Sequence, residues 1–295
     1  MTRAELLDCL QHTVGDFYKG EIDEAITLHL ELMLDDYQRK PFFYKSLLKY
    51  DRFMVVLSLF AFHYRDPLTP LSQVREFCLR RGYLSRNSLE SYFSFFIITG
   101  YMHVSVHPED ARLRIYRPTR FAVEEAARLI KAYLLPGCLL TPGGGAYGRA
   151  NDAATLLRRF FTGLVQFLDA DILLDSLLPG AKWIMNKDGG HLPMLALYLD
   201  ALRHRPANGG YKVSTYAELS SRLYVSRTHV MRLVREGETK GYFRCCGNTV
   251  EMRPMFAELV RHTMAINFAV ARVSMELGAD VKETEVFKPG AGRVG

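Results

Sequence analysis

The chain lacks the features that mark membrane and exported proteins. Its longest early apolar run, residues 53–62, is interrupted by Ser58 and is far shorter than the roughly 20 residues that cross a bilayer. No positively charged leader with an apolar core opens the chain, which argues against export. We therefore expect no membrane contact and a cytoplasmic location.

Cysteine is scarce, and the residue types that bind metals or cofactors form no familiar pattern. The 5 cysteines include no C-x-x-C pair, and their odd number does not suit a disulfide framework. The 9 histidines show no H-E-x-x-H spacing, and the glycines at 143–145 lack the Lys-Ser or Lys-Thr of a phosphate-binding loop. The sequence therefore predicts no metal, no cofactor and no enzymatic activity.

What the chain does contain fits a folded, basic protein of more than one domain. Its 295 residues suggest two domains of ordinary size, and a hydrophobic content of 48% is ample for their cores. Lysine and arginine number 38 against 32 aspartates and glutamates, which gives a formal net charge of +6. This balance favours a polyanionic partner such as nucleic acid.

The most informative feature is an internal repeat. At an offset of 141 positions the same residues recur in the same order: Tyr83, Ser85, Arg86, Gly100 and Tyr101 in a first copy, and Tyr224, Ser226, Arg227, Gly241 and Tyr242 in a second. An Arg-Pro pair closes each copy, at 117–118 and at 253–254. Matching residues at one shared offset predict two copies of one structural unit.

The second copy predicts helix, helix, capped helix and hairpin. The first helix covers 191–205, and Thr215 opens the next with Glu218 as its capping-box partner. Ser226 caps a third helix that ends before Gly241, and two strands follow around a turn at 247–248. The first copy follows the same plan, with a helix over 51–64 and a capped helix from Ser85 to Gly100.

This order of elements is that of a winged helix. We expect a mainly α fold with small β-hairpins (α+β), in which tandem winged helix-turn-helix units are joined by a helical scaffold. The expected segments are an N-terminal helical segment (1–49), the first winged helix (50–120), a helical connector (121–190), the second winged helix (191–254), a C-terminal helix (255–289) and a disordered tail (290–295).

Residues 215–254 resemble the winged helix-turn-helix of bacterial transcription regulators of the MarR type. The resemblance is carried by Glu218-Leu219, Leu223, Val225-Ser226-Arg227, Gly241-Tyr242 and Arg253-Pro254. It extends more loosely over the first copy. Members of that type are dimers with one unit per chain, so the resemblance implies a pseudo-dimer here, acting as a monomer or as a homodimer. It also implies a small-molecule effector held between the helices and the winged unit.

A helix of this kind can enter the major groove and present its outward side chains to the bases. In the second copy the candidate DNA-binding residues are Ser226, Arg227, Thr228, His229, Arg232 and Arg235, with Arg244 in the hairpin. In the first copy they are Ser85, Arg86, Asn87, Ser88 and Ser91, with Arg112 and Arg114 in the hairpin. The net charge is +2 over 226–240 and zero over 85–99, so we expect the second copy to dominate.

These observations predict a sequence-specific protein that binds double-stranded DNA and regulates transcription. One alternative is a plasmid replication initiator, which would bind repeated origin sites with two winged helices. Another is a protein-interaction scaffold of tandem winged helices without DNA contact. The cluster of Arg227, Arg232 and Arg235 argues against the scaffold, because interaction modules of that kind tend to lack a basic third helix.

Overall fold

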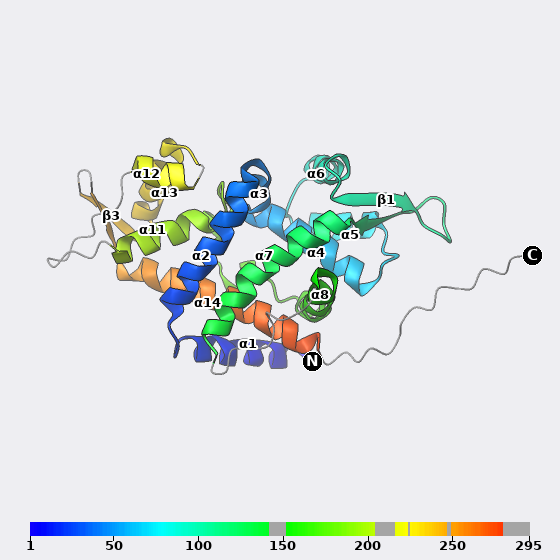
Figure 1. Ribbon diagram of the computed structural model, residues 1–295, viewed down its shortest axis with the longest axis horizontal. Helices are drawn as coiled ribbons and strands as arrows, with labels where there is room; N and C mark the ends of the chain where they lie inside the picture. Colours follow the sequence, from blue (N-terminus) through cyan, green and yellow to red (C-terminus); the bar gives the residue numbers. More distant parts are fainter. Residues whose placement is uncertain (142–151, 204–215, 224, 247–248, 280–295) are drawn as a thin grey trace, which may run out of the picture.

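A computed structural model describes residues 1–141, 152–203, 216–223, 225–246 and 249–279 (Figure 1). Several predicted features lie outside these residues. They are the glycines at 143–145, the Thr215 cap, Tyr224, the turn at 247–248 and the tail at 290–295.

The described chain is mainly helical and carries two small antiparallel hairpins. The first part contains α1 (Arg3–Phe17), α2 (Ile22–Arg39), α3 (Pro41–Leu47), α4 (Tyr50–Arg65), α5 (Leu71–Arg80), α6 (Arg86–Ile98), β1 (Met102–Val106), β2 (Arg114–Pro118) and α7 (Arg120–Leu139). The second part contains α8 (Ala153–Asp169), α9 (Leu174–Leu177), α10 (Lys182–Met185), α11 (Leu192–Arg203), α12 (Tyr216–Arg222), α13 (Arg227–Thr239), β3 (Phe243–Cys246), β4 (Thr249–Met252) and α14 (Pro254–Leu277).

The ends of α6 and α13 match as the repeat predicts. Ser85 Oγ accepts a hydrogen bond from the Ser88 backbone N–H at 3.3 Å, and Ser226 Oγ accepts one from His229 at 3.1 Å. Gly100 and Gly241 follow the two helices with φ angles of 76° and 78°, a left-handed conformation that favours glycine. The predicted serine caps and the glycine ends of α6 and α13 are therefore confirmed.

The hairpins also join their helices in the same way. Tyr101 N–H donates to the Phe96 carbonyl at 2.8 Å, and Tyr242 N–H donates to the Gly237 carbonyl at 2.8 Å. The strands then pair in antiparallel register, with Met102 opposite Pro118 and Phe243 opposite Met252. The element order of helix, helix, capped helix and hairpin thus recurs in the described parts of both copies.

The sequence predicts a helix over 123–134 that is broken at Pro136-Gly137. The predicted break is wrong, because α7 continues past Pro136. Proline has no N–H to donate to the carbonyl of Ala132, four residues earlier. His29 Nδ1 lies 2.7 Å from that carbonyl oxygen and takes the place of the missing donor. The helix therefore keeps its hydrogen bonding through a side chain of α2.

Between the two copies lie α2, α7, α8 and α14, which pack on one another (Figure 1). Each copy's first helix packs on a helix from the other half of the chain: α4 on α8, and α11 on α2. One continuous apolar core runs through the copies and the helices between them. The predicted helical segments therefore share their core with both copies. No helix among the described residues has the length and apolar character needed to span a membrane.

Candidate nucleic-acid interface

One face of α13 is apolar and the opposite face is basic. Val230, Leu233 and Val234 are buried. Their burial turns the rest of the helix toward solvent, because positions three and four apart share a face. Most of the residues predicted to contact DNA are accordingly exposed: Ser226, Arg227, Thr228, Arg232 and Arg235, with Arg244 on β3.

His229 does not belong to this exposed face, and the prediction that it points outward is wrong. Only 7% of the residue is exposed, and its Nε2 atom is buried with no hydrogen-bond partner among the described residues. The segment before α11 covers this side of α13, where Lys187 pairs with Glu236 at 3.0 Å. Burial lowers the pKa of His229, outweighing the opposing effect of the Asp188 carboxylate.

The first half of α6 presents the residues predicted for the first copy. Arg86, Asn87, Ser88 and Ser91 are exposed together with the cap Ser85, while the apolar side of the helix enters the core. The Arg86 side chain is 63% exposed and lies 3.7 Å from Glu76, so part of its charge is balanced locally.

The hairpin of the first copy holds one of its two predicted contacts in an internal ion pair. Arg112 donates to Asp110 at 3.1 Å and 3.2 Å, and these bonds lower the pKa of Asp110. Arg114 is exposed on β2. The two predicted arginines therefore lie on the same hairpin, but Arg112 meets an acid at the hairpin tip.

The second half of α6 carries an exposed apolar surface that the sequence analysis missed. Ile98 is 84% exposed and Phe95 is 37% exposed. The Phe43 ring of α3 stacks on Phe95 at a centroid distance of 6.5 Å and on Tyr101 at 4.6 Å. Solvent exposure of these positions depends on how α3 packs, so helical spacing alone could not identify them.

The helices α6 and α13 lie on the same side of the molecule, on either side of α3 (Figure 1). Basic residues also occur between them. Lys49 at the start of α4 lies 2.7 Å from Asp188, and Lys45 of α3 lies 3.9 Å from it. Burial works against ionisation of Asp188, but the two lysines outweigh it and keep the pKa of this carboxyl below its usual value.

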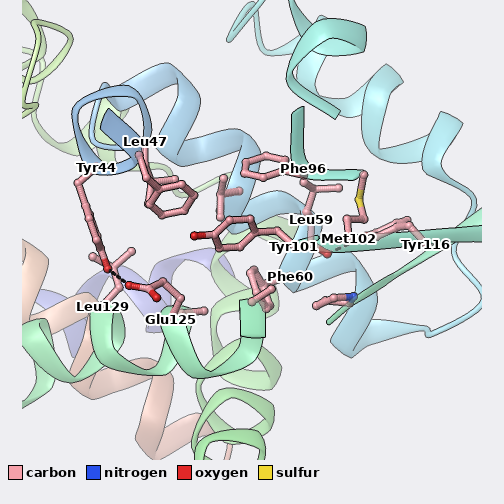
Figure 2. A pocket seen from close by; sticks show the side chains of 15 residues that line it. Tyr44, Leu47, Leu59, Phe60, Phe96, Tyr101, Met102, Tyr116, Glu125 and Leu129 are labelled. Atoms are coloured by element: carbon pink, nitrogen blue, oxygen red, sulfur yellow. Dashed lines mark hydrogen bonds between the residues drawn. The ribbon is translucent and has the colours of Figure 1, made fainter. Parts of the chain in front are cut away.

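A mostly apolar cavity of about 60 Å³ lies between the first copy and α7 (Figure 2). Phe96, Tyr101 and Met102 line it from the first copy, and Glu125 and Leu129 line it from α7. The volume is roughly that of two water molecules in the liquid, so a larger guest needs side chains to move.

The one carboxylate that lines this cavity, Glu125, is fully paired. It accepts hydrogen bonds from Tyr44 Oη at 2.5 Å and from Arg128 at 2.8 Å, and it also pairs with Lys40. Burial opposes its charge, but these donors together hold the pKa of Glu125 below its usual value. Glu125 is therefore a charged group held in place by its donors, in the lining of a cavity that is mostly apolar.

Comparison with known proteins gives no match: no family model, no curated protein and no solved structure matches the chain. Among the described residues, no group of three or more His, Cys, Asp or Glu side chains is arranged to hold a metal ion. The function must therefore be argued from the geometry of the two copies.

Proposed function

We propose that the protein is cytoplasmic, binds double-stranded DNA at specific sequences and regulates transcription. In this proposal each copy is a winged helix-turn-helix of the MarR type, and the two form a pseudo-dimer within one chain. The observation that carries the proposal is the exposed basic face of α13. Arg227, Arg232 and Arg235 are exposed on this helix, and Ser226 caps its start.

The second copy is the main reader. With α13 in the major groove, Arg227 and Arg232 can each donate two hydrogen bonds to a guanine edge. The free backbone N–H groups beside Ser226 favour a phosphate at the helix N-terminus. Arg244, exposed on β3, would reach the neighbouring backbone or minor groove.

The helices between the copies keep the two readers at a fixed spacing. α4 packs on α8 and α11 packs on α2, so each copy is held by the opposite half of the chain. One further contact joins the halves: His29 Nε2 lies 2.7 Å from His191 Nε2. Because both readers belong to one body, binding of one raises the effective concentration of the other at its site.

The cavity between the first copy and α7 is the place for a small-molecule effector. Its lining joins Phe96 and Met102 of the first copy to Leu129 of the scaffold. An apolar molecule larger than the cavity would push α6 and the hairpin away from α7. Such a molecule would shift DNA affinity to the extent that it binds the displaced arrangement better.

The test is selection of the purified protein on a pool of random duplexes, followed by a salt titration of the enriched sequence. We expect one enriched motif and an affinity that falls steeply with salt. The variant Arg227→Ala, Arg232→Ala should lose the enrichment. The variant Lys19→Ala is the control, because Lys19 is an exposed cation in the turn that follows α1, and α1 lies away from α6 and α13 (Figure 1).

The form of the enriched motif separates the alternatives. Two half-sites would support the pseudo-dimeric regulator. Directly repeated sites of the kind found in origins would favour a replication initiator. Absence of both enrichment and salt-dependent binding would leave the protein-interaction scaffold.

A further inference from the structure

A groove of about 430 Å³ runs along the first half of α6 and separates it from α3 and the start of α4. Its lining residues are Ser46, Arg52, Leu84, Asn87, Ser88, Ser91, Tyr92 and Phe95. Asn87, Ser88 and Ser91 belong to the predicted DNA face, whereas Ser46, Arg52 and Tyr92 do not. The groove therefore extends that face toward the centre of the molecule.

The polar groups in the groove suit an anion. Its lining contains one guanidinium, three serine hydroxyls and one amide, and no carboxylate among the described residues. Arg52 donates to Ser46 Oγ at 2.5 Å, which leaves the Ser46 hydroxyl hydrogen free to be donated. The guanidinium also lies over the Tyr92 ring at 5.7 Å, so its position is fixed from two sides.

The contribution of Tyr92 to the groove is its ring, which lies beneath the Arg52 guanidinium. The residue is only 7% exposed, and its hydroxyl is buried with no hydrogen-bond partner among the described residues. A buried hydroxyl without a partner is energetically unfavourable.

We propose that this groove binds a phosphate of the DNA backbone and anchors the first copy on the duplex. The inference rests on the proposed DNA-binding function and defines what the first copy contributes to it. The net charge of α6 is zero, and Arg86 is partly balanced by Glu76. Arg52 therefore adds a cation to the DNA face of the first copy, and it comes from α4, outside the capped helix α6.

The inference is tested with Arg52→Gln in the full chain, using the enriched duplex and a scrambled duplex. Loss of one phosphate contact should reduce the slope of log affinity against log salt by about 0.9. We expect a loss of about 5- to 10-fold at moderate salt, equal for both duplexes, because a phosphate contact carries no sequence information.

Tyr92→Phe removes only the buried hydroxyl and keeps the ring beneath Arg52, so it should leave the affinity for both duplexes and the salt slope unchanged. Lys19→Gln is the control for loss of one exposed positive charge, and thermal unfolding checks that each variant is folded. A titration of inorganic phosphate distinguishes the source of the anion. Saturation by free phosphate at micromolar concentration would assign the groove to a free anion and overturn the DNA contact.

The two proposals fail in different ways. A wild-type protein that binds no duplex overturns the DNA-binding function, and the groove inference with it. A wild-type protein that binds with a steep salt slope, together with an unchanged slope for Arg52→Gln, overturns the groove inference alone.

Discussion

The helices α6 and α13 begin and end in the same way but present different surfaces. Both start after a capping serine and stop before a glycine of positive φ. α13 exposes arginines along its length, whereas α6 exposes hydroxyls in its first half and Phe95 and Ile98 in its second. The capping residues give the two helices the same ends. Their outward residues differ, because packing does not constrain those positions.

A second difference lies inside the copies. At the offset of 141, Phe96 and Met102 of the first copy correspond to Gly237 and Phe243 of the second. The first copy fills its interior with an aromatic ring from the helix, and the second fills it with a ring from the strand. Phe96 is 5% exposed and Phe243 is 2% exposed, so each ring is part of the core. Each copy keeps one aromatic ring in its interior, but the ring comes from a different element.

The largest expected effect follows from this exchange. A Cβ atom at Gly237 would lie 2.4 Å from the Phe243 ring, so Gly237→Ala must displace that ring. Overpacking of this kind costs about 1–3 kcal/mol, and we expect the upper part of that range in urea unfolding. Gly15→Ala is the control, since a Cβ there meets nothing within 4 Å and alanine favours a helix by about 1 kcal/mol.

The exchange also predicts a rescue. In a Phe243→Met background, which restores the side chain of the first copy at this position, Gly237→Ala should cost less than it does alone. A double-mutant cycle measures the coupling between the two sites. Additive effects would show that the two copies do not share this packing relationship.

Acid should weaken the contact that joins the two halves. Burial lowers the pKa of His29 to about 4 and lowers that of His191, so both rings are neutral in the native state. Unfolded histidine titrates near pH 6.5, so the unfolded chain binds more protons below that pH. Stability is therefore full above pH 6.5 and is lost as the pH falls toward 4.

For His29 alone the loss between pH 7 and pH 5 is about 2 kcal/mol. Urea unfolding at the two pH values measures it, and His29→Gln should flatten the dependence. His12→Gln is the control, because the His12 side chain is 81% exposed. An unchanged pH dependence in His29→Gln would mean that this pair does not set the acid sensitivity of the contact.

Local signals were enough to predict the ends of α6 and α13. A serine cap or a helix-ending glycine acts through its own neighbours, so the sequence carries the whole cause. The burial of His229 and the continuation of α7 past Pro136 depend on segments far along the chain. His29 replaces the missing donor of Pro136 by bonding to the carbonyl of Ala132, which is 103 residues away from it, and periodicity cannot report such a contact.

The candidate site likewise contains some residues that the sequence predicts and others that it does not. Its exposed arginines follow from the apolar spacing of α13, and the sequence predicted most of them. The groove residues Ser46 and Arg52 come from α3 and α4, and only the tertiary arrangement of those helices beside α6 brings them to the proposed DNA face. No local motif marks a polar residue that becomes part of a site through tertiary packing.

The two copies should differ in their share of DNA affinity. Arg227→Ala should weaken binding to the enriched duplex by about 10- to 100-fold, the value of a two-bond guanine contact. Arg86→Ala should cost less than about 3-fold, because Glu76 already balances part of its charge. Fluorescence anisotropy at one fixed salt concentration measures both variants. Equal losses would overturn the dominance of the second copy.

The smallest effect concerns the hairpin of the first copy. Asp110 holds Arg112 by side-chain hydrogen bonds, and its own Oδ1 accepts the Arg112 backbone N–H at 2.9 Å. Asp110→Asn keeps that acceptor but removes the charge, so Arg112 becomes available to the duplex. We expect affinity to rise about 2-fold at low salt and the gain to vanish at high salt, as for an exposed charge.

Asp8→Asn on α1 removes an exposed acid far from the hairpin and should leave affinity unchanged. An equal gain in both variants would assign the effect to net charge, and no gain in Asp110→Asn would place this hairpin away from the DNA and deepen the asymmetry between the copies.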